Sequence, residues 1–264
     1  MQNVKPKKAL GQHFLTDKSI AARIAGTLDA YKGIPVLEVG PGMGVLTRFL
    51  LDGGHDVTVV EIDKESVAYL EENFPELKDR IVGDDFLRMD LSAVMDGRKF
   101  CVIGNYPYNI SSQIFFKILD YKDMIPCCSG MLQKEVAERL AARPGSKVYG
   151  ILSVLLQAWY DVEYLFTVSE DVFNPPPKVK SGVIRCTRNG VTSLGCDEKL
   201  FKTVVKTSFG QRRKTLRNSL RGLLPPAAAI DDDPVWTMRP EQLSVSQFVD
   251  LTLKIAGMRG IVTE

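Results

Sequence analysis

The stretch IGNYPYNISS, residues 103–112, combines side chains that can hold an aromatic amine. Asn105 offers both a carbonyl oxygen and an NH₂ group, while Pro107 fixes its own backbone angle and lacks an N–H. Tyr108 presents a ring on which a planar base can stack. The stretch follows an apolar run, residues 100–103, that is typical of a buried strand. The sequence therefore predicts a site for an exocyclic amine at the end of a strand.

Adenine is the amine that this set fits. Its N6 lone pair is delocalised into the ring, so the nitrogen is a poor nucleophile. Two acceptors, the Asn105 side chain and a main-chain carbonyl near Tyr106 and Pro107, can orient this nitrogen and stabilise the positive charge that it gains on alkylation. Because the alkylated nitrogen is strongly acidic, no dedicated base is required. Ideal positioning alone contributes roughly 7–11 kcal/mol to such reactions.

A base inside RNA must leave its stack to reach such a pocket, so a second aromatic wall is expected. Phe173, in the segment VFNPPPKV, is the candidate, because the prolines fix the loop that carries it. A core phenylalanine at a strand end is the alternative interpretation of this residue.

A glycine-rich turn, LEVGPGMGVLT, points to a bound cofactor. Glycines at 40, 42 and 44 allow a tight turn and close approach of a ligand. Their spacing differs from the G-x-G-x-x-G fingerprint of dinucleotide-binding proteins. Glu38 stands two residues before the first glycine, where it would repel a pyrophosphate but suits a sulfonium or an α-ammonium group.

Acidic residues end the next two predicted strands. Glu61 can accept both ribose hydroxyls of an adenosine, and Ile62 beside it is expected to contact the same cofactor. Asp85 can accept from an adenine amino group, with Phe86 placed to stack. The order of these features along successive strands predicts S-adenosylmethionine as the cofactor, although each feature alone is common.

Alternating strand and helix patterns explain how these residues meet. Strands are predicted at 34–40, 55–63, 79–85 and 99–105, and helices at 45–54, 64–74 and 111–119, the last with Ser111 or Ser112 as N-cap. These are followed by a strand and a helix that start at Cys127 and by an apolar helix that ends near Trp159. Two further strands are predicted at VEYLFTV and KSGVIRCTR. Repeated βα units imply a doubly wound, mostly parallel sheet with an antiparallel edge, whose ligands sit at the carboxyl ends of the strands.

The remainder of the chain has only helical patterns. Leucines at 216, 220 and 223 recur with helical spacing, and a further helix is predicted with Ser244 or Ser246 as its cap. Two domains are expected, a methyltransferase domain over 1–189, whose first 16 residues form a basic arm and a cofactor-mouth motif, and a helical domain over 190–264.

The composition is that of a globular protein, with 45% hydrophobic and 25% charged residues in 264. No apolar run approaches the ~18 residues that span a bilayer. The N-terminus lacks the apolar region of a secretory signal. The five cysteines are odd in number and have no C-x-x-C spacing, so we interpret them as reduced residues of a cytosolic protein rather than zinc ligands. No metal and no membrane contact are expected, and the protein is expected to be a monomer.

Basic charge is concentrated at the two ends of the chain. Residues 199–230 contain eight Lys or Arg and no Asp or Glu. On a continuous helix, Arg213, Arg217 and Arg221 would line one face. Such clusters neutralise phosphates, although a solvated basic surface is the plain alternative. The predicted RNA-binding residues are Lys5, Lys7, Lys8, Arg212, Arg213, Lys214, Arg217 and Arg221.

Seven motifs together resemble the KsgA-type small-subunit ribosomal RNA adenine N6,N6-dimethyltransferases. They occur in the family's order over about residues 5–220, and they are GQHFLTD, LEVGPGMGVLT, VVEID, GDDF, NYPYNISS, VFNPPPKVKSGVIR and FGQRRKTLRNSL. The resemblance implies dimethylation of two adjacent adenosines near the 3′ end of small-subunit rRNA, in an assembling subunit. It also implies the Rossmann-like class I SAM-dependent methyltransferase fold with an antiparallel last strand, and a helical C-terminal domain.

The resemblance also assigns residues to the cofactor and to the target base. Gln12, His13 and Leu15 would lie at the cofactor's mouth. Gly40, Gly42, Glu61 and Asp85 would hold the cofactor, Asn105 would lie between it and the target, and Tyr108 and Phe173 would sandwich the adenine. Many relatives have asparagine at the position of His13 and leucine at that of Tyr106, so position 13 is expected to act through its side chain or its backbone.

Three other functions remain open. The first is methylation of a large-subunit rRNA adenine, as in macrolide-resistance enzymes, although these generally lack the PPPKV and QRRKTLRN patterns. The second is a non-catalytic RNA-binding assembly factor that keeps the fold. The third is a small-molecule or DNA methyltransferase, which the basic segments and the proline loop disfavour.

Overall fold

The computed structural model describes residues 4, 6–7, 10–225 and 230–260. The chain forms two compact units, one of Met1–Glu138 and Asp161–Arg188, the other of Arg139–Tyr160 and Asn189–Glu264. The predicted domain boundary at 189/190 lies one residue from the last crossing between the units. Residues 139–160, which the sequence placed in the first domain, group with the second unit.

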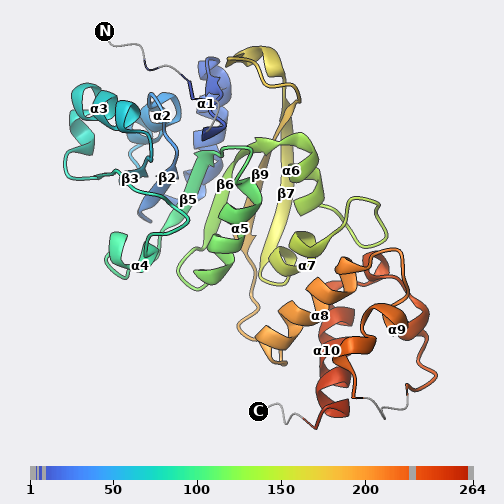
Figure 1. Cartoon of the computed structure of the whole chain (residues 1–264). Helices are drawn as coiled ribbons and strands as arrows, with labels where there is room; N and C mark the ends of the chain where they lie inside the picture. The colour runs from blue at the N-terminus through green and yellow to red at the C-terminus, as the bar shows by residue number, and fades with distance from the viewer. Residues whose placement is uncertain (1–3, 5, 8–9, 226–229, 261–264) are drawn as a thin grey trace. The chain divides into compact units, whose positions relative to one another are not determined.

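Within the described residues, one seven-stranded sheet organises the first unit (Figure 1). Its strands, in spatial order, are β4 (Ile81–Val82), β3 (Val57–Val60), β2 (Val36–Val39), β5 (Cys101–Asn105), β6 (Cys127–Gln133), β9 (Ser181–Arg188) and β7 (Tyr160–Val168). The pairs from β4 to β6 are parallel, and β9 is antiparallel to β6. The antiparallel strand therefore lies inside the sheet, with β7 rather than β9 at its edge.

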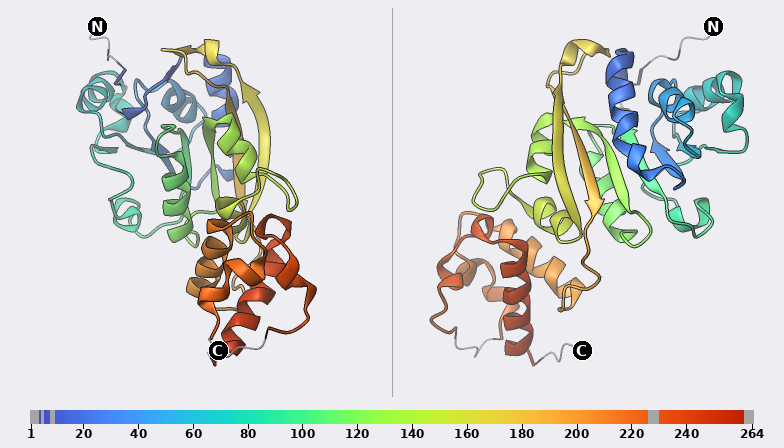
Figure 2. Two further views of the ribbon diagram at one scale, coloured as in Figure 1. Left: turned by 45° about the vertical axis from the view of Figure 1, so that its right-hand side comes forward. Right: turned by 180° about the vertical axis from the view of Figure 1, so that it is seen from behind.

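Helices cover both faces of this sheet. Figures 1 and 2 show α1 on one face and α5 on the other. The helices that begin in the first unit are α1 (Lys18–Ala25), α2 (Val45–Asp52), α3 (Lys64–Asn73), α4 (Leu91–Val94), α5 (Ser111–Asp120) and α6 (Lys134–Leu140). All four residues of β2 are buried, as expected for a parallel strand covered on both sides.

The start of α5 differs from the prediction. Ile110 occupies the cap position and no side chain caps the helix, because Ser111 already belongs to the helix. The hydroxyl of Ser111 instead donates to the carbonyl oxygen of Tyr108, at 3.3 Å. The predicted serine N-cap is therefore wrong, and the serine stabilises the preceding NYPY turn.

A small second sheet was not predicted. β1 (Phe14–Leu15) pairs antiparallel with β8 (Phe173–Asn174), placing Leu15 opposite Phe173. Two-residue strands carry no period in the sequence, so pattern alone cannot detect this pairing. It joins the N-terminal segment to the proline loop.

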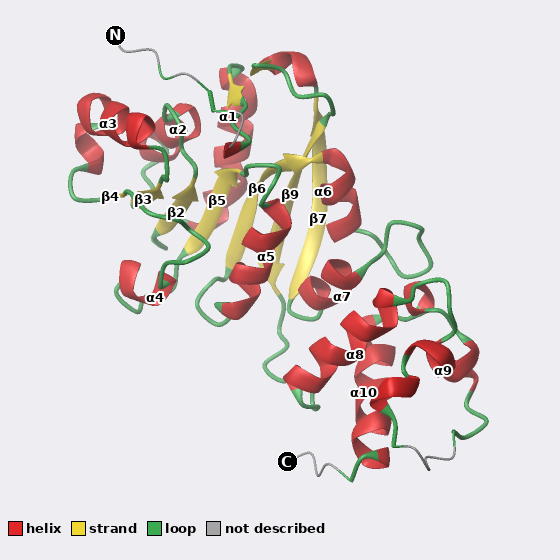
Figure 3. Ribbon diagram, in the orientation of Figure 1, coloured by secondary structure: helices red, strands yellow, loops and turns green. Residues whose placement is uncertain are grey.

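The second unit contains α7 (Ile151–Gln157), α8 (Glu198–Gly210), α9 (Leu216–Ser219) and α10 (Val245–Met258) (Figure 3). Ser244 caps α10 by accepting from the Gln247 amide, as predicted. The predicted helix through 213–223 is wrong, because residues 211–215 form a turn and α9 ends after one turn. Leu216 and Leu220 are nevertheless buried. No helix in the described part of the chain is long and apolar enough to cross a membrane.

Candidate active site

A cavity opens at the carboxyl ends of the parallel strands in the first unit. Most of its lining comes from residues 10–15, 38–43, 60–62, 84–87 and 105–110. Every predicted cofactor-binding residue lies in this lining, as do the four residues of NYPY. The parallel βα order explains this convergence, because it brings the ends of successive strands to one edge of the sheet.

The glycine-rich turn requires glycine for local reasons. Gly40, Gly42 and Gly44 all have φ between 55° and 74°, in the left-handed region. A Cβ on Gly42 would lie 2.9 Å from the ring of Phe14, and one on Gly44 would lie 2.3 Å from the ring of Phe74. Gly44 therefore serves packing against the end of α3, while Gly40 and Gly42 keep the cavity wall free of side chains.

Glu38 is a buried acid that faces the cavity. Its side chain is 1% exposed, and no described residue makes a hydrogen bond to its Oε2. Burial raises the pKa of Glu38 to about 8; the neighbouring Thr47 side chain opposes this shift, and the charge of Glu61 adds to it slightly. A buried carboxyl with an unsatisfied oxygen is expected to attract a cationic group into the cavity.

Glu61 is buried and held by the backbone. Its Oε2 accepts from the Gly42 amide at 3.0 Å and its Oε1 accepts from the Asp63 amide at 2.9 Å. Burial raises its pKa, and these backbone hydrogen bonds oppose the shift. A carboxylate has about four acceptor positions, so each oxygen can still accept a ligand hydroxyl.

Three further side chains, Ile62, Asp85 and Phe86, line the cavity beside Glu61. Asp85 accepts from the Leu87 amide through Oδ1, at 2.9 Å, and its Oδ2 lies 3.4 Å from Nε of Arg88. Phe86 is buried, whereas Ile62 is 53% exposed. An exposed isoleucine beside Glu61 provides an apolar surface for a planar ring at the cavity mouth.

Asn105, at the end of β5, has a defined amide orientation. Its Nδ2 donates to the main-chain carbonyl of His13 at 3.0 Å. A carbonyl can only accept, so the NH₂ group must face His13, which leaves the Oδ1 acceptor for another partner. Position 13 thus acts on Asn105 through its backbone. The His13 ring makes a separate contact, between Nδ1 and the Pro175 carbonyl at 2.9 Å.

The two tyrosines of NYPY have different roles. Tyr106 is 1% exposed and points into the core, where its hydroxyl donates to the Ser129 carbonyl at 2.6 Å. Tyr108 lines the cavity, and its hydroxyl lies 2.5 Å from that of Ser181. Its ring centroid is 5.3 Å from that of His13. Only Tyr108 therefore offers a ring to a ligand, and Tyr106 contributes its backbone alone.

Phe173 lies elsewhere than the prediction requires. Its side chain is 4% exposed and packs in the core cluster with Leu15 and Val183. It is absent from the cavity lining among the described residues. The pairing of β1 with β8 explains this placement, because it turns the ring toward the core. In this structure, the alternative interpretation of a core phenylalanine holds.

Several residues that contact the site are not among those predicted from the sequence. Ser181, which is buried on β9, orients Tyr108. Gly11 has φ of 64° and lies against Asn109, since a Cβ on it would be 2.7 Å from that side chain's oxygen. Met43 and Asp84 also line the cavity. Gly11 lies within the motif GQHFL, which could have indicated it, but no pattern linked Ser181 to a tyrosine 73 residues earlier.

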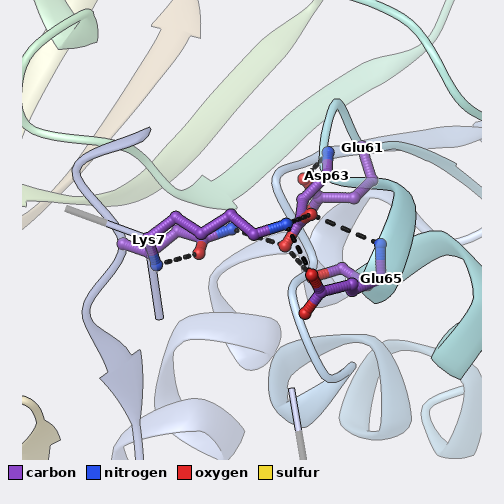
Figure 4. A network of polar contacts seen from close by, with 6 residues as sticks. Lys7, Glu61, Asp63 and Glu65 are labelled. Atoms are coloured by element: carbon purple, nitrogen blue, oxygen red, sulfur yellow. Dashed lines mark hydrogen bonds and ion pairs between the residues drawn. The ribbon is translucent and has the colours of Figure 1, made fainter. Parts of the chain in front are cut away.

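The RNA-binding role predicted for the N-terminal basic residues is wrong for Lys7. Lys7 is not a free RNA-binding side chain, because its Nζ lies 2.5 Å from Oδ1 of Asp63 and 3.1 Å from Oε1 of Glu65 (Figure 4). A lysine in contact with two carboxylates has its charge already compensated. Lys5 and Lys8 lie outside the described residues.

In the second unit, the predicted basic residues fall into two groups. Nε of Arg212 lies 3.7 Å from Oε2 of Glu241, and its guanidinium donates to the Ser146 carbonyl. These contacts partly neutralise its charge. The others are exposed, and no ion pair involves them within the described residues; they are Arg213, Lys214, Arg217 and Arg221. They lie on a turn, a short helix and a 3₁₀ turn rather than on one helix face.

Comparison with known proteins shows the family to which the chain belongs. Residues 3–253 match the model of the ribosomal RNA adenine dimethylase family. The chain is 73% identical over 253 residues to ribosomal RNA small subunit methyltransferase A of Parabacteroides distasonis, covering 96% of this chain and 95% of that protein. It is 59% identical to the protein of the same name from Flavobacterium johnsoniae, covering 97% of each.

Solved structures show the same fold. A dimethyladenosine transferase from Plasmodium falciparum superposes with a TM-score of 0.78 at 22% identity, over 96% of this chain and 100% of that one. The 23S rRNA methyltransferase ErmE superposes with a TM-score of 0.64 at 28% identity, over 90% and 99%. With the observed sheet and helices, these likenesses confirm the predicted class I methyltransferase fold.

Proposed function

Because the chain belongs to the ribosomal RNA adenine dimethylase family, we propose that it dimethylates N6 of two adjacent adenosines near the 3′ end of small-subunit rRNA. The cofactor is S-adenosylmethionine and the substrate is an assembling small ribosomal subunit. The observation that carries the proposal is the Asn105 amide, whose NH₂ group is fixed by His13 so that its oxygen is the acceptor left for an amine. The relatives named small subunit methyltransferase A support this choice of subunit.

The residues of the cavity fit this cofactor. Glu38 would offer a buried, unsatisfied oxygen to a cationic amino acid portion, Glu61 would offer its carboxylate to the ribose, and Ile62 and Phe86 would contact the base. Asp85 would accept from the adenine amino group. When bound, the cofactor supplies an electrophilic methyl group on a sulfonium. Gln12, His13 and Leu15, which also line the cavity, close its N-terminal side.

Asn105 prepares the target nitrogen. Its Oδ1 accepts a hydrogen bond from the amine, together with a main-chain carbonyl near Tyr106 and Pro107, which turns the nitrogen lone pair toward the methyl group. These acceptors stabilise the positive charge that develops on nitrogen, and the nitrogen then loses a proton. Tyr108 stacks on the flipped base. Phe173 becomes the second wall only if its ring leaves the core.

Cofactor affinity is expected to rise with pH. Since burial raises the pKa of Glu38 to about 8, this carboxyl is mostly protonated at pH 7 in the free protein, and a cationic ligand favours its ionised form. Each unit of pH below that pKa lowers the ionised fraction about tenfold, so affinity should rise by about that factor per unit between pH 6 and 7.5. Calorimetry in buffers of different ionisation enthalpy would detect the proton released on binding.

Glu38→Gln provides the control for this prediction. The neutral amide should bind the cofactor weakly and with no dependence on pH over the same range, close to the unaltered protein at pH 6. Equal affinity of the unaltered protein at pH 6 and 7.5 would contradict the assignment of Glu38 to the cationic group.

The exposed basic residues of the second unit are proposed to bind RNA phosphates. Replacing Arg213, Lys214, Arg217 and Arg221 together by glutamine should reduce the slope of log K against log salt concentration by about three, since each phosphate contact contributes about 0.7–0.9. Binding to small subunits across a salt series measures this slope. Lys32→Gln, an exposed lysine of the first unit, should leave it unchanged. An unchanged slope in the fourfold variant would show that these residues form only a solvated surface.

Methyl transfer to ribosomal subunits tests the proposed function as a whole. Small subunits from a strain that lacks the modification are incubated with protein and cofactor, and their rRNA is examined by mass spectrometry. Two adjacent dimethyladenosines near the 3′ end are expected. Methylation of large-subunit rRNA instead would favour the function of the 23S rRNA methyltransferase neighbour. No transfer to either subunit, with binding retained, would favour a non-catalytic assembly factor.

The remaining proposals concern the location of the protein, its oligomeric state and its metal content. We propose that the protein acts in the cytosol, where small subunits assemble, as a monomer and without a metal ion. Sedimentation of the purified protein alone and with small subunits would test the monomeric state.

A further inference from the structure

A strap made of Lys7 and residues 10–16 lies along one side of the cavity. One end is fixed by the second sheet, where Phe14 and Leu15 pair with β8. Beyond this pairing, the amide and the hydroxyl of Thr16 both donate to the carbonyl of Val172, at 2.8 Å each. Residues 10–15 line the cavity itself, so the strap is part of the cavity wall.

The other end of the strap is fixed by an ion pair and by the side-chain amide of Gln12 (Figure 4). Nζ of Lys7 lies 2.5 Å from Oδ1 of Asp63, whose side chain is almost fully buried. Gln12 links the same two residues, since it accepts from the Lys7 amide at 2.7 Å and donates to Oδ2 of Asp63 at 3.3 Å. The Asp63 amide in turn donates to Glu61, the proposed ribose ligand.

The middle of the strap contacts both Asn105 and the glycine-rich turn. The carbonyl of His13 accepts from the Asn105 amide, and Gly11 lies against Asn109. The ring of Phe14 lies against Gly42 of the glycine-rich turn. A displacement of this segment would therefore release the Asn105 side chain and change the wall beside the cofactor.

We propose that Lys7 and Asp63 are positioning residues for methyl transfer, acting by fastening the strap so that the His13 carbonyl fixes the Asn105 amide. The inference rests on the proposed function for its catalytic consequence. Neither residue has to touch the substrate. This role differs from the RNA contact predicted for Lys7 from sequence. Loss of positioning would lower kcat, whereas loss of an RNA contact would raise the KM for subunits.

The charge on Asp63 makes the ion pair effective. Burial acts to raise the pKa of this carboxyl, but hydrogen bonds from Lys7, Gln12 and the Glu65 amide outweigh burial and keep the pKa below its ordinary value. The carboxylate therefore stays ionised at neutral pH, and removing its cation would leave a buried charge without its partner, which is costly. Neutralising either partner removes the attraction that holds this end of the strap.

Lys7→Met, which keeps most of the side-chain length and removes the charge, tests the proposal. Hydrogen exchange of the backbone amides of residues 10–16 should become at least tenfold faster, while exchange in β2 and β5 stays unchanged. The kcat for methyl transfer to small subunits should fall at least tenfold, with the KM for subunits within about twofold of its original value. Lys7→Arg should restore both exchange and kcat to within about threefold. Lys32→Met, at an exposed ion pair of the same unit, should change neither.

Other outcomes would overturn the proposal. A raised KM for subunits with unchanged kcat and unchanged exchange would make Lys7 an RNA contact instead. Equal loss in Lys7→Arg and Lys7→Met would exclude the ion pair as the cause. If Lys7→Met does not fold, Asp63→Asn, which keeps the shape of the side chain, must give the same pattern. Since hydrogen exchange needs neither RNA nor catalysis, it still tests the strap if the unaltered protein proves inactive on small subunits.

Discussion

Asn105→Ala is expected to lower the kcat for methyl transfer by about 10²–10³-fold, the effect typical of removing one group that stabilises transition-state charge. Affinity for S-adenosylmethionine should change by less than about threefold, because Glu38, Glu61 and Asp85 remain in place. The kcat falls because the variant lacks the Oδ1 acceptor, which orients the amine only as it reacts. Single-turnover kinetics on small subunits and calorimetry with the cofactor measure the two quantities.

Asn105→Asp separates the two functions of this side chain. Aspartate keeps an acceptor for the amine but cannot donate to the His13 carbonyl. We expect its rate to lie between those of the unaltered protein and Asn105→Ala, at least about tenfold above the latter. Equal rates for the two variants would mean that fixing the strap, rather than accepting from the amine, is the main contribution of Asn105. A fully active Asn105→Ala would remove the residue from the mechanism.

Glu61→Ala should weaken cofactor binding by about 10²-fold or more. The change removes the acceptor for two ribose hydroxyls, and charged hydrogen bonds of this kind contribute roughly 1.5–3 kcal/mol each. It also leaves the amides of Gly42 and Asp63 without their acceptor, which loosens the glycine-rich turn. Equilibrium binding of S-adenosylmethionine and of S-adenosylhomocysteine measures the effect.

A nearby acid gives the control for Glu61. Glu71 is exposed on α3, outside the cavity lining, so Glu71→Ala should leave the affinity within about twofold. Since both variants lose one negative charge, the comparison separates ribose binding from a change in net charge. Unchanged affinity in Glu61→Ala would place the nucleoside elsewhere.

The cofactor side of the cavity could be predicted from sequence because its residues follow the ends of successive strands. Glycine spacing and strand order place Gly40, Glu61, Asp85 and Asn105 at one edge of the sheet without any knowledge of side-chain packing. The structure brings all four to the same cavity.

The errors at Phe173 and Lys7 share a physical cause, since each depends on a partner far away in the sequence. Phe173 turns into the core because β8 pairs with β1, about 160 residues earlier in the chain. Lys7 is compensated by Asp63, a contact between a basic N-terminus and a helix cap. The leucines after Arg213 have helical spacing, yet the helix stops after Ser219. Tertiary contacts decide such cases, and local propensity does not encode them.

A crystal structure of the protein with S-adenosylmethionine bound would show directly whether the cavity holds the cofactor beside Asn105. We expect ribose hydroxyls on the Glu61 carboxylate, the amino acid ammonium near Glu38, and the methyl group facing Oδ1 of Asn105, with Nδ2 still on the His13 carbonyl. A cofactor seated outside this cavity, or an Asn105 amide that points its NH₂ group at the methyl group, would contradict this expectation.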